Sequence, residues 1–213
     1  MTNPDNQWLL VDLTHSIDDS LPVFEGDEPV SLTNVKEIAK DGFTDYVLHS
    51  GMHVGTHIDG ALHMNRNGGF ISDYPLDVFI GQGFFIDLSL GDYQTAFANI
   101  ENVDLSGRVV VLCFGYSSHW RTPDYFTSYP IIDEDFISIL VRKGVKMIGM
   151  DTPSPDYSPY PVHLLLFEYN VLIIENLTNL VMLKDADYFE IIALPLKVNS
   201  DSAPARVIAR LKA

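Results

Sequence analysis

The stretch DEDFISILVRKGVKMIGMD, residues 133–151, places a predicted helix and a predicted strand in direct succession. Asp133 stands where a helix is capped, apolar residues follow at helical spacing, and Gly144 suits the end of that helix. Residues 146–151 are typical of a short buried strand. A helix that leads into a buried strand favours an α/β fold.

Short strands predominate in the rest of the chain. Seven more stretches are rich in β-branched and aromatic residues: 8–14, 43–58, 83–90, 108–115, 170–177, 190–198 and 205–213. Two more helices are predicted, over residues 92–100 and 160–170, and residues 22–30 read as a loop punctuated by proline and glycine. We therefore expect a single α/β domain, residues 1–213, with a mixed sheet and a few flanking helices.

The composition indicates an acidic chain with ample material for a core. Of the 213 residues, 46% are hydrophobic, and 29 acidic residues against 13 basic ones give a formal charge of −16. Such a charge repels phosphate backbones and anionic lipid, so neither nucleic acid nor a membrane is expected as a partner. No apolar stretch approaches the roughly 18 to 20 residues of a membrane helix.

Cysteine usage and the first residues bear on the compartment. Cys113 is the only cysteine, so no intrachain disulfide can form, which fits the reducing cytoplasm. The opening MTNPDNQWLL has no basic segment followed by a long apolar run, so no secretory signal is indicated. A cytoplasmic protein is the expectation.

A second stretch, HVGTHIDGALH at residues 53–63, carries three histidines and an aspartate. Imidazole nitrogen and carboxylate oxygen are ligands that Zn²⁺ and similar ions prefer where thiolates are absent. An ordinary polar loop is the simpler alternative, because two histidines four residues apart also occur by chance. The added aspartate, the further histidine and the interleaved glycines favour a metal site with a proton-transfer group beside it.

Neither a regular helix nor a straight strand brings His53, His57 and Asp59 onto one ion. In a helix, Asp59 lies about 200° round from His57, at ~100° per residue. In a strand, His53 and Asp59 are roughly 20 Å apart at ~3.3 Å per residue, whereas ligand bonds are about 2 Å long. The segment must therefore bend if it is a site, and its glycines allow a bend. They are Gly51, Gly55 and Gly60.

Two further candidate ligands lie downstream, at His163 and Glu175. Glu175 ends the apolar run NVLIIE, which reads as a buried strand, and a buried carboxylate requires a cation or a close hydrogen-bond partner. The simpler alternatives are a strand-end carboxylate in solvent and a loop histidine with its own hydrogen bonds. Taken singly, each residue favours its simpler alternative.

Together these stretches resemble the cyclase-like family of metal-dependent hydrolases, which includes bacterial kynurenine formamidases and isatin hydrolases. The family signature His-x-Gly-Thr-His-x-Asp-x-Pro-x-His is similar to HVGTHIDGALH, and the downstream family pattern is similar to DTPSPD, His163 and ENL. The opening VDLTHSIDDSLPVFEGDEP resembles the family's first strand and loop. The likeness runs from about residue 8 to residue 210. It implies a barrel-like central sheet and assembly as a homodimer or homotetramer.

The resemblance also implies a ligand set. His53, His57 and Asp59 would hold a first divalent ion, with Zn²⁺ as the first choice and Mn²⁺ as the second. In members with two ions the aspartate bridges them, and His163 and Glu175 would complete the second site. Whether this chain takes one ion or two stays open, as does the possibility that His163 and Glu175 only support the site.

The chemistry that the resemblance implies is hydrolysis of a small molecule. A bound metal lowers the pKa of water from ~15.7 toward ~7 and polarises the carbonyl of an amide, formamide, lactam or ester. His63 would be the proton donor and acceptor, a task that imidazole performs at neutral pH. Two alternatives stay open: a metal-binding protein without catalytic activity, and a cyclase or dehydratase that uses the same ion.

The chain departs from the family around the expected pocket. Ala61 replaces the proline of the motif, which is expected to loosen the turn without removing a ligand. Phe24 stands where kynurenine formamidases carry a tryptophan for the substrate ring, and Glu25 follows where a proline is usual. Phe24 is therefore the candidate substrate contact, and a loop aromatic packed on the core is the alternative. Trp120 and His119 are interpreted as ordinary loop residues rather than pocket walls.

Overall fold

The computed structural model describes residues 8–212. Residues 1–7 and residue 213 lie outside this range, and so does most of the opening segment in which no secretory signal was found. The strands are β1 (Trp8–Asp12), β2 (Ser31–Lys36), β3 (Asp45–His49), β4 (His57–Asp59), β5 (Ile80–Asp87), β6 (Val109–Cys113), β7 (Met147–Met150), β8 (Leu172–Glu175), β9 (Phe189–Pro195) and β10 (Ser202–Lys212). The α-helices are α1 (Ile38–Asp41), α2 (Tyr93–Ile100), α3 (Glu134–Arg142) and α4 (Pro161–Glu168).

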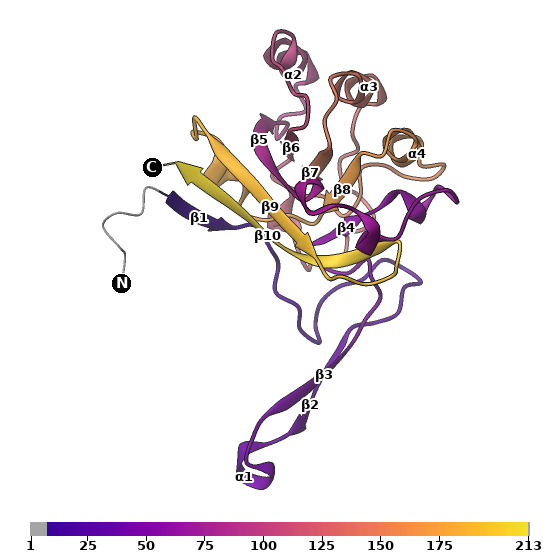
Figure 1. Cartoon of the computed structure of the whole chain (residues 1–213), viewed down its shortest axis with the longest axis vertical. Helices are drawn as coiled ribbons and strands as arrows, with labels where there is room; N and C mark the ends of the chain where they lie inside the picture. Colours follow the sequence, from indigo (N-terminus) through magenta and orange to yellow (C-terminus); the bar gives the residue numbers. More distant parts are fainter. Residues whose placement is uncertain (1–7, 213) are drawn as a thin grey trace.

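Seven strands close into a barrel (Figure 1). Hydrogen-bonded neighbours follow the order β10–β4–β8–β7–β6–β5–β9, and β9 pairs with β10 again to close the ring. The strands β5 to β8 run parallel, whereas the pairs that involve β4, β9 or β10 are antiparallel. The first strand, β1, pairs with the outer part of the long strand β10. The expectation of an α/β fold with a mixed, barrel-like sheet is thus confirmed.

Three helices, α2, α3 and α4, lie along the outside of the parallel strands (Figure 1). The helix α3 begins as its sequence predicts, because the Asp133 side chain accepts a hydrogen bond from the Phe136 N–H. Its apolar stripe is buried against the sheet, with Phe136, Ile137 and Leu140 inaccessible to solvent. These helices therefore cover one side of the barrel and leave the end of the strands free for a site.

The strands separate two apolar cores. Along β6, Val109, Val111 and Cys113 face the core inside the barrel, while Val110 and Leu112 face the core under the helices. Successive side chains of a strand point to opposite faces, and a strand buried on both faces reads as a continuous apolar run. This explains why the run RVVVLCFG is apolar throughout.

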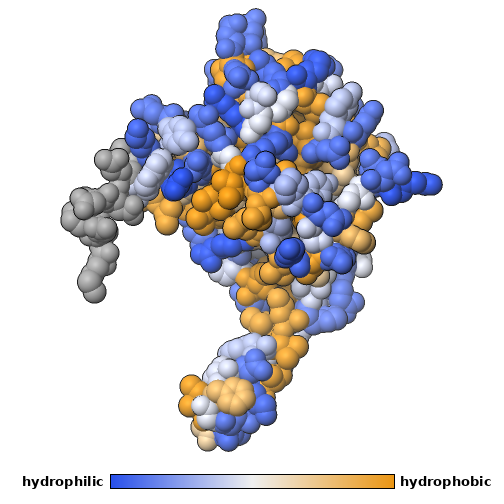
Figure 2. Space-filling model, in the orientation of Figure 1, coloured by the Kyte–Doolittle hydropathy of each residue, from blue (hydrophilic) through white to orange (hydrophobic). Residues whose placement is uncertain are grey.

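A hairpin formed by β2, α1 and β3 projects from the barrel as an arm (Figure 1). Its two strands pair only with each other, with Ser31 opposite His49. Figure 2 shows hydrophobic residues along this arm and at its base. The exposed apolar side chains are Val35, Ile38, Phe43, Tyr46, Val47 and Leu48. The sequence does not indicate β2, because SLTNVK has no alternation of apolar and polar residues.

The predicted helices and strands are present in the described residues, with ends shifted by up to three positions, but the extended stretch 43–58 divides into β3 and β4 with a loop between them. The last strand, for example, begins at Ser202 rather than at residue 205. None of the helices in this part of the chain is long and apolar enough to cross a membrane. The extent of the domain, residues 1–213, stays a prediction.

Candidate metal centre

The segment 53–63 bends, so that its polar side chains converge. His53 lies in the loop before β4, His57 and Asp59 lie two residues apart on β4, and His63 ends a short 3₁₀ helix, Ala61–His63. Residues two apart on a strand point to the same face. The bend and the strand together thus place the predicted ligands on one side of the chain.

The glycines of the segment have different roles in this bend. Gly55 has a φ of +57°, in the left-handed region that only glycine adopts without strain. At Gly60, a Cβ atom would lie 2.8 Å from the carbonyl oxygen of Asp201, so a side chain there would displace the neighbouring backbone. Gly51 shows neither feature, and a Cβ there meets nothing closer than 3.9 Å.

Sheet pairing brings the downstream ligand Glu175 to the same place. Glu175 on β8 is paired directly with His57 on β4, and His163 reaches the pair from the helix α4. The side chains of His57, Asp59, His163 and Glu175 are between 1% and 7% exposed. The simpler alternative of a solvated strand-end carboxylate is therefore wrong for Glu175, which is buried among imidazoles.

The inner atoms of this cluster face one another without forming regular hydrogen bonds. His57 Nε2 lies 3.3 Å from Asp59 Oδ1 and 3.3 Å from Glu175 Oε2, and His53 Nδ1 lies 2.9 Å from Asp59 Oδ1. Among the described residues, His57 Nε2 and Asp59 Oδ1 are buried and lack any hydrogen-bond partner. Such atoms are costly to bury unless a cation satisfies them, so the donor set fits a divalent metal.

The outer nitrogen of each imidazole is held by a fixed acceptor. His57 Nδ1 donates to the carbonyl oxygen of Gly55 at 2.8 Å. His163 Nδ1 donates to Asp156 Oδ1 at 2.5 Å, since a carboxylate can only accept. Metal-binding histidines characteristically use the outer nitrogen in this way, which leaves the lone pair of the inner nitrogen for the metal.

The cluster attracts positive charge. Burial by itself would lower the pKa of His57, but the carboxylates of Asp59 and Glu175 raise it well above its usual value. At His53 burial also acts to lower the pKa, but the carboxylates of Asp59 and Asp201 outweigh burial and raise the pKa to about 9. These carboxylates therefore favour a positive charge at the imidazole nitrogens. Either bound protons or a divalent metal can supply that charge.

The charge balance at His163 is similar. Burial disfavours the charged ring, but the hydrogen bond to Asp156 and the contact with Glu175 raise the pKa of His163 to about 10. Asp156 also accepts the backbone N–H groups of Val162 and His163 at 2.7 and 3.2 Å, at the start of α4. Asp156 was not among the predicted site residues, although it lies within the DTPSPD run that carries the family resemblance.

Three overlapping groups of side chains in the described residues offer metal-binding atoms within 4.8 Å of one another. They are His53, His57 and Asp59; Asp59, His63 and His163; and His53, His63 and Asp201. The first is the ligand set expected for the first ion. His163 belongs to the second group together with Asp59, while Glu175 belongs to none and lies 3.6 Å from His163 through Oε1.

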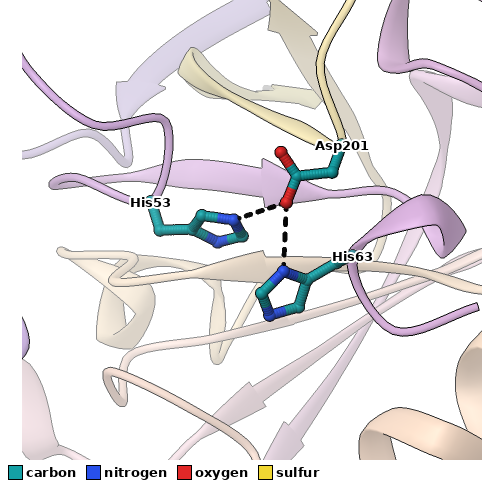
Figure 3. Close-up of side chains that lie close together, drawn as sticks. All are labelled: His53, His63 and Asp201. Carbon is teal, nitrogen blue, oxygen red and sulfur yellow. Dashed lines mark hydrogen bonds and ion pairs between the residues drawn. The ribbon is translucent and has the colours of Figure 1, made fainter.

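Asp201 is a member of the site that was not predicted from the sequence. Its Oδ2 atom lies 2.8 Å from His53 Nε2 and 3.0 Å from His63 Nδ1 (Figure 3). The hydrogen bonds from these two imidazoles hold the pKa of the Asp201 carboxyl well below its usual range. Asp201 lies 138 residues from His63 in the chain and has no motif around it, so only the sheet pairing reveals it.

A cavity of about 230 Å³ opens beside the cluster. Its polar floor contains the candidate ligands, and its apolar walls include Phe24, Trp120 and Phe126. Phe24 also packs edge-on against Phe126 with ring centroids 5.4 Å apart, so it lines the cavity and packs on the core at once. The interpretation of Trp120 as an ordinary loop residue is wrong, whereas the exposed His119 stacks on Tyr116 outside the cavity lining.

The Ala61 position is tighter than its sequence suggests. Ala61 is fully buried, and its backbone N–H donates to the Tyr74 hydroxyl at 3.1 Å. Proline, the usual residue of the motif, has no N–H and cannot form this bond. Alanine thus allows a hydrogen bond to Tyr74 that proline could not form, and this bond offsets the loosening of the turn expected from the sequence.

The sequence matches the protein family described as "Putative cyclase" over residues 11–157. The chain belongs to the putative cyclase family. A relative in this family, the kynurenine formamidase of Bacillus mycoides (strain KBAB4), is 30% identical over 210 residues, which are 96% of this chain and 98% of the relative. The resemblance to cyclase-like hydrolases is therefore confirmed.

Solved structures share the fold of this putative cyclase. An isatin hydrolase bound to the product analogue thioisatinate superimposes with a TM-score of 0.87 at 20% identity, covering 97% of this chain and 94% of the other. A protein from Bacillus stearothermophilus, named a predicted metal-dependent hydrolase, superimposes with a TM-score of 0.76 at 26% identity, covering 95% and 98%. These relatives and the donor set support a divalent metal at the cluster.

Proposed function

We propose that this protein is a metal-dependent hydrolase that cleaves a C–N amide-type bond of a small molecule, such as a formamide or a lactam. The observation that carries the proposal is the convergence of His53, His57 and Asp59, with two buried atoms that lack hydrogen-bond partners. The kynurenine formamidase relatives and the isatin hydrolase fold support the same reaction class.

His53, His57 and Asp59 would hold the ion, and His163 and Glu175 would contribute to a second position. A bound divalent metal supplies Lewis acidity, which makes water nucleophilic at neutral pH and polarises a carbonyl oxygen. We propose Zn²⁺ as the ion, because imidazole and carboxylate ligands suit it, with Mn²⁺ as the alternative.

We propose that His63 moves the proton of the reaction. Its Nδ1–H donates to Asp201, so its Nε2 carries the lone pair and is free to accept a proton. The ring is about one quarter exposed, with 28% of the side chain accessible, and it lines the cavity. It can therefore take a proton from the attacking water and deliver it to the leaving nitrogen without leaving the site.

The cavity limits the substrate. A volume of about 230 Å³ with aromatic walls accommodates a molecule with one aromatic ring or a small fused system. Phe24 would contact that ring, in the position where kynurenine formamidases carry a tryptophan. Because phenylalanine is smaller and lacks the indole N–H, we propose that the preferred substrate differs from N-formylkynurenine.

The experiment that tests the function uses the purified full-length protein. It is freed of metal with a chelator, reconstituted with Zn²⁺ or Mn²⁺, and assayed by product analysis on N-formylkynurenine, isatin and simple lactams. Hydrolysis that requires the added metal supports the proposal. Bound metal without hydrolysis of any of these compounds would favour a binding protein, and a cyclised or dehydrated product would favour the alternative enzyme class.

We also propose that copies of this chain associate through the arm, residues 31–49. The arm exposes six large apolar side chains, and an isolated two-stranded ribbon is only marginally stable in water. It carries two lysines, two aspartates and one glutamate, a net charge of −1, whereas the whole chain carries −16. A second copy can therefore pack on the arm without close approach of the acidic bodies.

Light scattering on the protein as it elutes from a size-exclusion column tests this association. We expect a dimer or tetramer for the natural chain and a shift to monomer in a Phe43→Asp/Val47→Asp variant, because both side chains are more than half exposed. A monomeric natural chain would contradict the proposal.

We further place the protein in the cytoplasm, because its one cysteine, Cys113, is buried and unpaired.

A further inference from the structure

Asp201 stands between the candidate metal ligands and the proton-transfer group. One oxygen, Oδ2, accepts from His53 Nε2 at 2.8 Å and from His63 Nδ1 at 3.0 Å (Figure 3). Because a carboxylate only accepts, the contacts with Asp201 put the hydrogen of each ring on that side. The Ser202 hydroxyl also lies 2.8 Å from His53 Nε2 and can accept the same hydrogen. In the neutral rings, the opposite nitrogens, His53 Nδ1 and His63 Nε2, then carry the lone pairs.

The backbone fixes Asp201 in this position. Its carbonyl oxygen accepts the Gly60 N–H at 2.9 Å, and the next residue, Ser202, is paired with Asp59 across strands β10 and β4. The close approach needs glycine at position 60, since a Cβ atom there would lie 2.8 Å from that carbonyl oxygen. The motif residue Gly60 thus provides the space in which Asp201 sits.

We propose that Asp201 is a positioning residue that orients His53 and His63 together through a single carboxylate oxygen. The lone pair of His53 is thereby directed toward Asp59, and the lone pair of His63 is kept available for proton transfer. This inference rests on the proposed function, because it assigns His53 to the metal and His63 to the proton. It adds a coupling between metal binding and proton transfer that neither residue provides alone.

The direct test replaces Asp201 by asparagine, whose neutral oxygen can occupy the same place but accepts both N–H groups more weakly than the charged carboxylate does. We expect metal affinity to fall between about 10- and 100-fold, the range for groups that orient a ligand. We also expect the His63 proton to redistribute between Nδ1 and Nε2. The metal dissociation constant is measured by chelator competition, and the tautomer by ¹⁵N NMR of the metal-free protein at a pH where the ring is neutral.

A second variant moves Asp201 without changing any polar group. Gly60→Ala places a methyl group against the Asp201 carbonyl and should weaken metal binding and disturb the His63 tautomer in the same direction as Asp201→Asn. Gly51→Ala is the matched control, because its Cβ meets nothing closer than 3.9 Å and its effect on both readouts should be negligible. Gly60→Ala and its control Gly51→Ala therefore still test the proposal if Asp201→Asn folds poorly.

The outcomes separate this inference from the proposed function. Weaker metal binding together with an altered His63 tautomer in Asp201→Asn supports it. An unchanged tautomer, or an unchanged dissociation constant, overturns the joint role of Asp201 while leaving the metal-dependent hydrolase intact. If the natural protein binds no metal at all, the proposed function fails, and the joint role of Asp201 fails with it.

Discussion

The two ends of the histidine cluster differ in their access to water. At the closed end, the side chains of His57, Asp59 and Glu175 are 7% exposed or less, and two of their atoms lack any hydrogen-bond partner within residues 8–212. At the open end, His53, His63 and Asp201 are 27% to 32% exposed, and their contacts are ordinary hydrogen bonds. The closed end thus has the features of a cation site, whereas the open end is accessible to a substrate.

The strongest test of this difference is a substitution at the closed end. Asp59→Asn removes the charge that faces the imidazoles of His53 and His57, so we expect metal affinity to fall by more than about 100-fold, beyond the range for supporting groups. Hydrolysis should be lost with the metal. Isothermal titration with Zn²⁺ measures the change.

Asp151 provides the matched control for this substitution. It is as buried as Asp59, at 1% exposure, but it accepts the Phe114 and Ser117 N–H groups outside the cluster. Asp151→Asn should retain the natural metal affinity. Equal losses in the two variants would show that burial of a carboxylate, and not metal binding, explains the effect.

The corresponding substitution at the open end should separate turnover from binding. In His63→Ala the expected ligands His53, His57 and Asp59 remain, so we expect metal content near that of the natural protein and a kcat reduced by about 10²- to 10⁴-fold. Loss of the metal as well would assign His63 to the ligand set, through its group with Asp59 and His163. The exposed His119 serves as control, and His119→Ala should change neither quantity.

Asp156 tests whether the closed end depends on its supporting groups. Asp156→Asn should weaken metal binding by about 10- to 100-fold, because its amide cannot accept from His163 Nδ1 and from both backbone N–H groups. Asp133→Asn is the control, since Asp133 caps α3 in a similar way but lies outside the cluster. An equal change in metal affinity for both variants would contradict a specific role for Asp156.

The smallest effect is expected in the cavity wall. Phe24→Trp restores the residue that kynurenine formamidases carry and should raise kcat/KM for N-formylkynurenine relative to isatin by about tenfold or less, because one apolar contact discriminates weakly. Metal affinity should stay the same. Steady-state kinetics on both compounds measure the ratio, and an unchanged ratio would argue that Phe24 packs on the core without touching the substrate.

The sequence predicted the closed end better than the open end. The spacing of His53, His57 and Asp59 required a bend, and the apolar run before Glu175 raised a buried carboxylate as one of two alternatives, although the solvated one was favoured. Both inferences depend on neighbours within a few residues. The ligand assignments themselves stay predictions until a metal is measured.

Asp201 could not be predicted in the same way, because its position depends on the pairing of β10 with β4. These strands are more than 140 residues apart, and no local pattern indicates that they are neighbours. The arm was missed for a related reason, since β2 packs on no core and therefore carries no apolar alternation. Contacts that the fold creates between distant segments are thus where the sequence alone was insufficient.

The most direct measurement is anomalous X-ray diffraction at the zinc edge from crystals of the reconstituted protein. An ion at the closed end predicts a peak about 2 Å from His57 Nε2 and from an oxygen of Asp59. Metal coordinated elsewhere, or no peak between these two side chains, would contradict the claim that this cluster binds the catalytic ion.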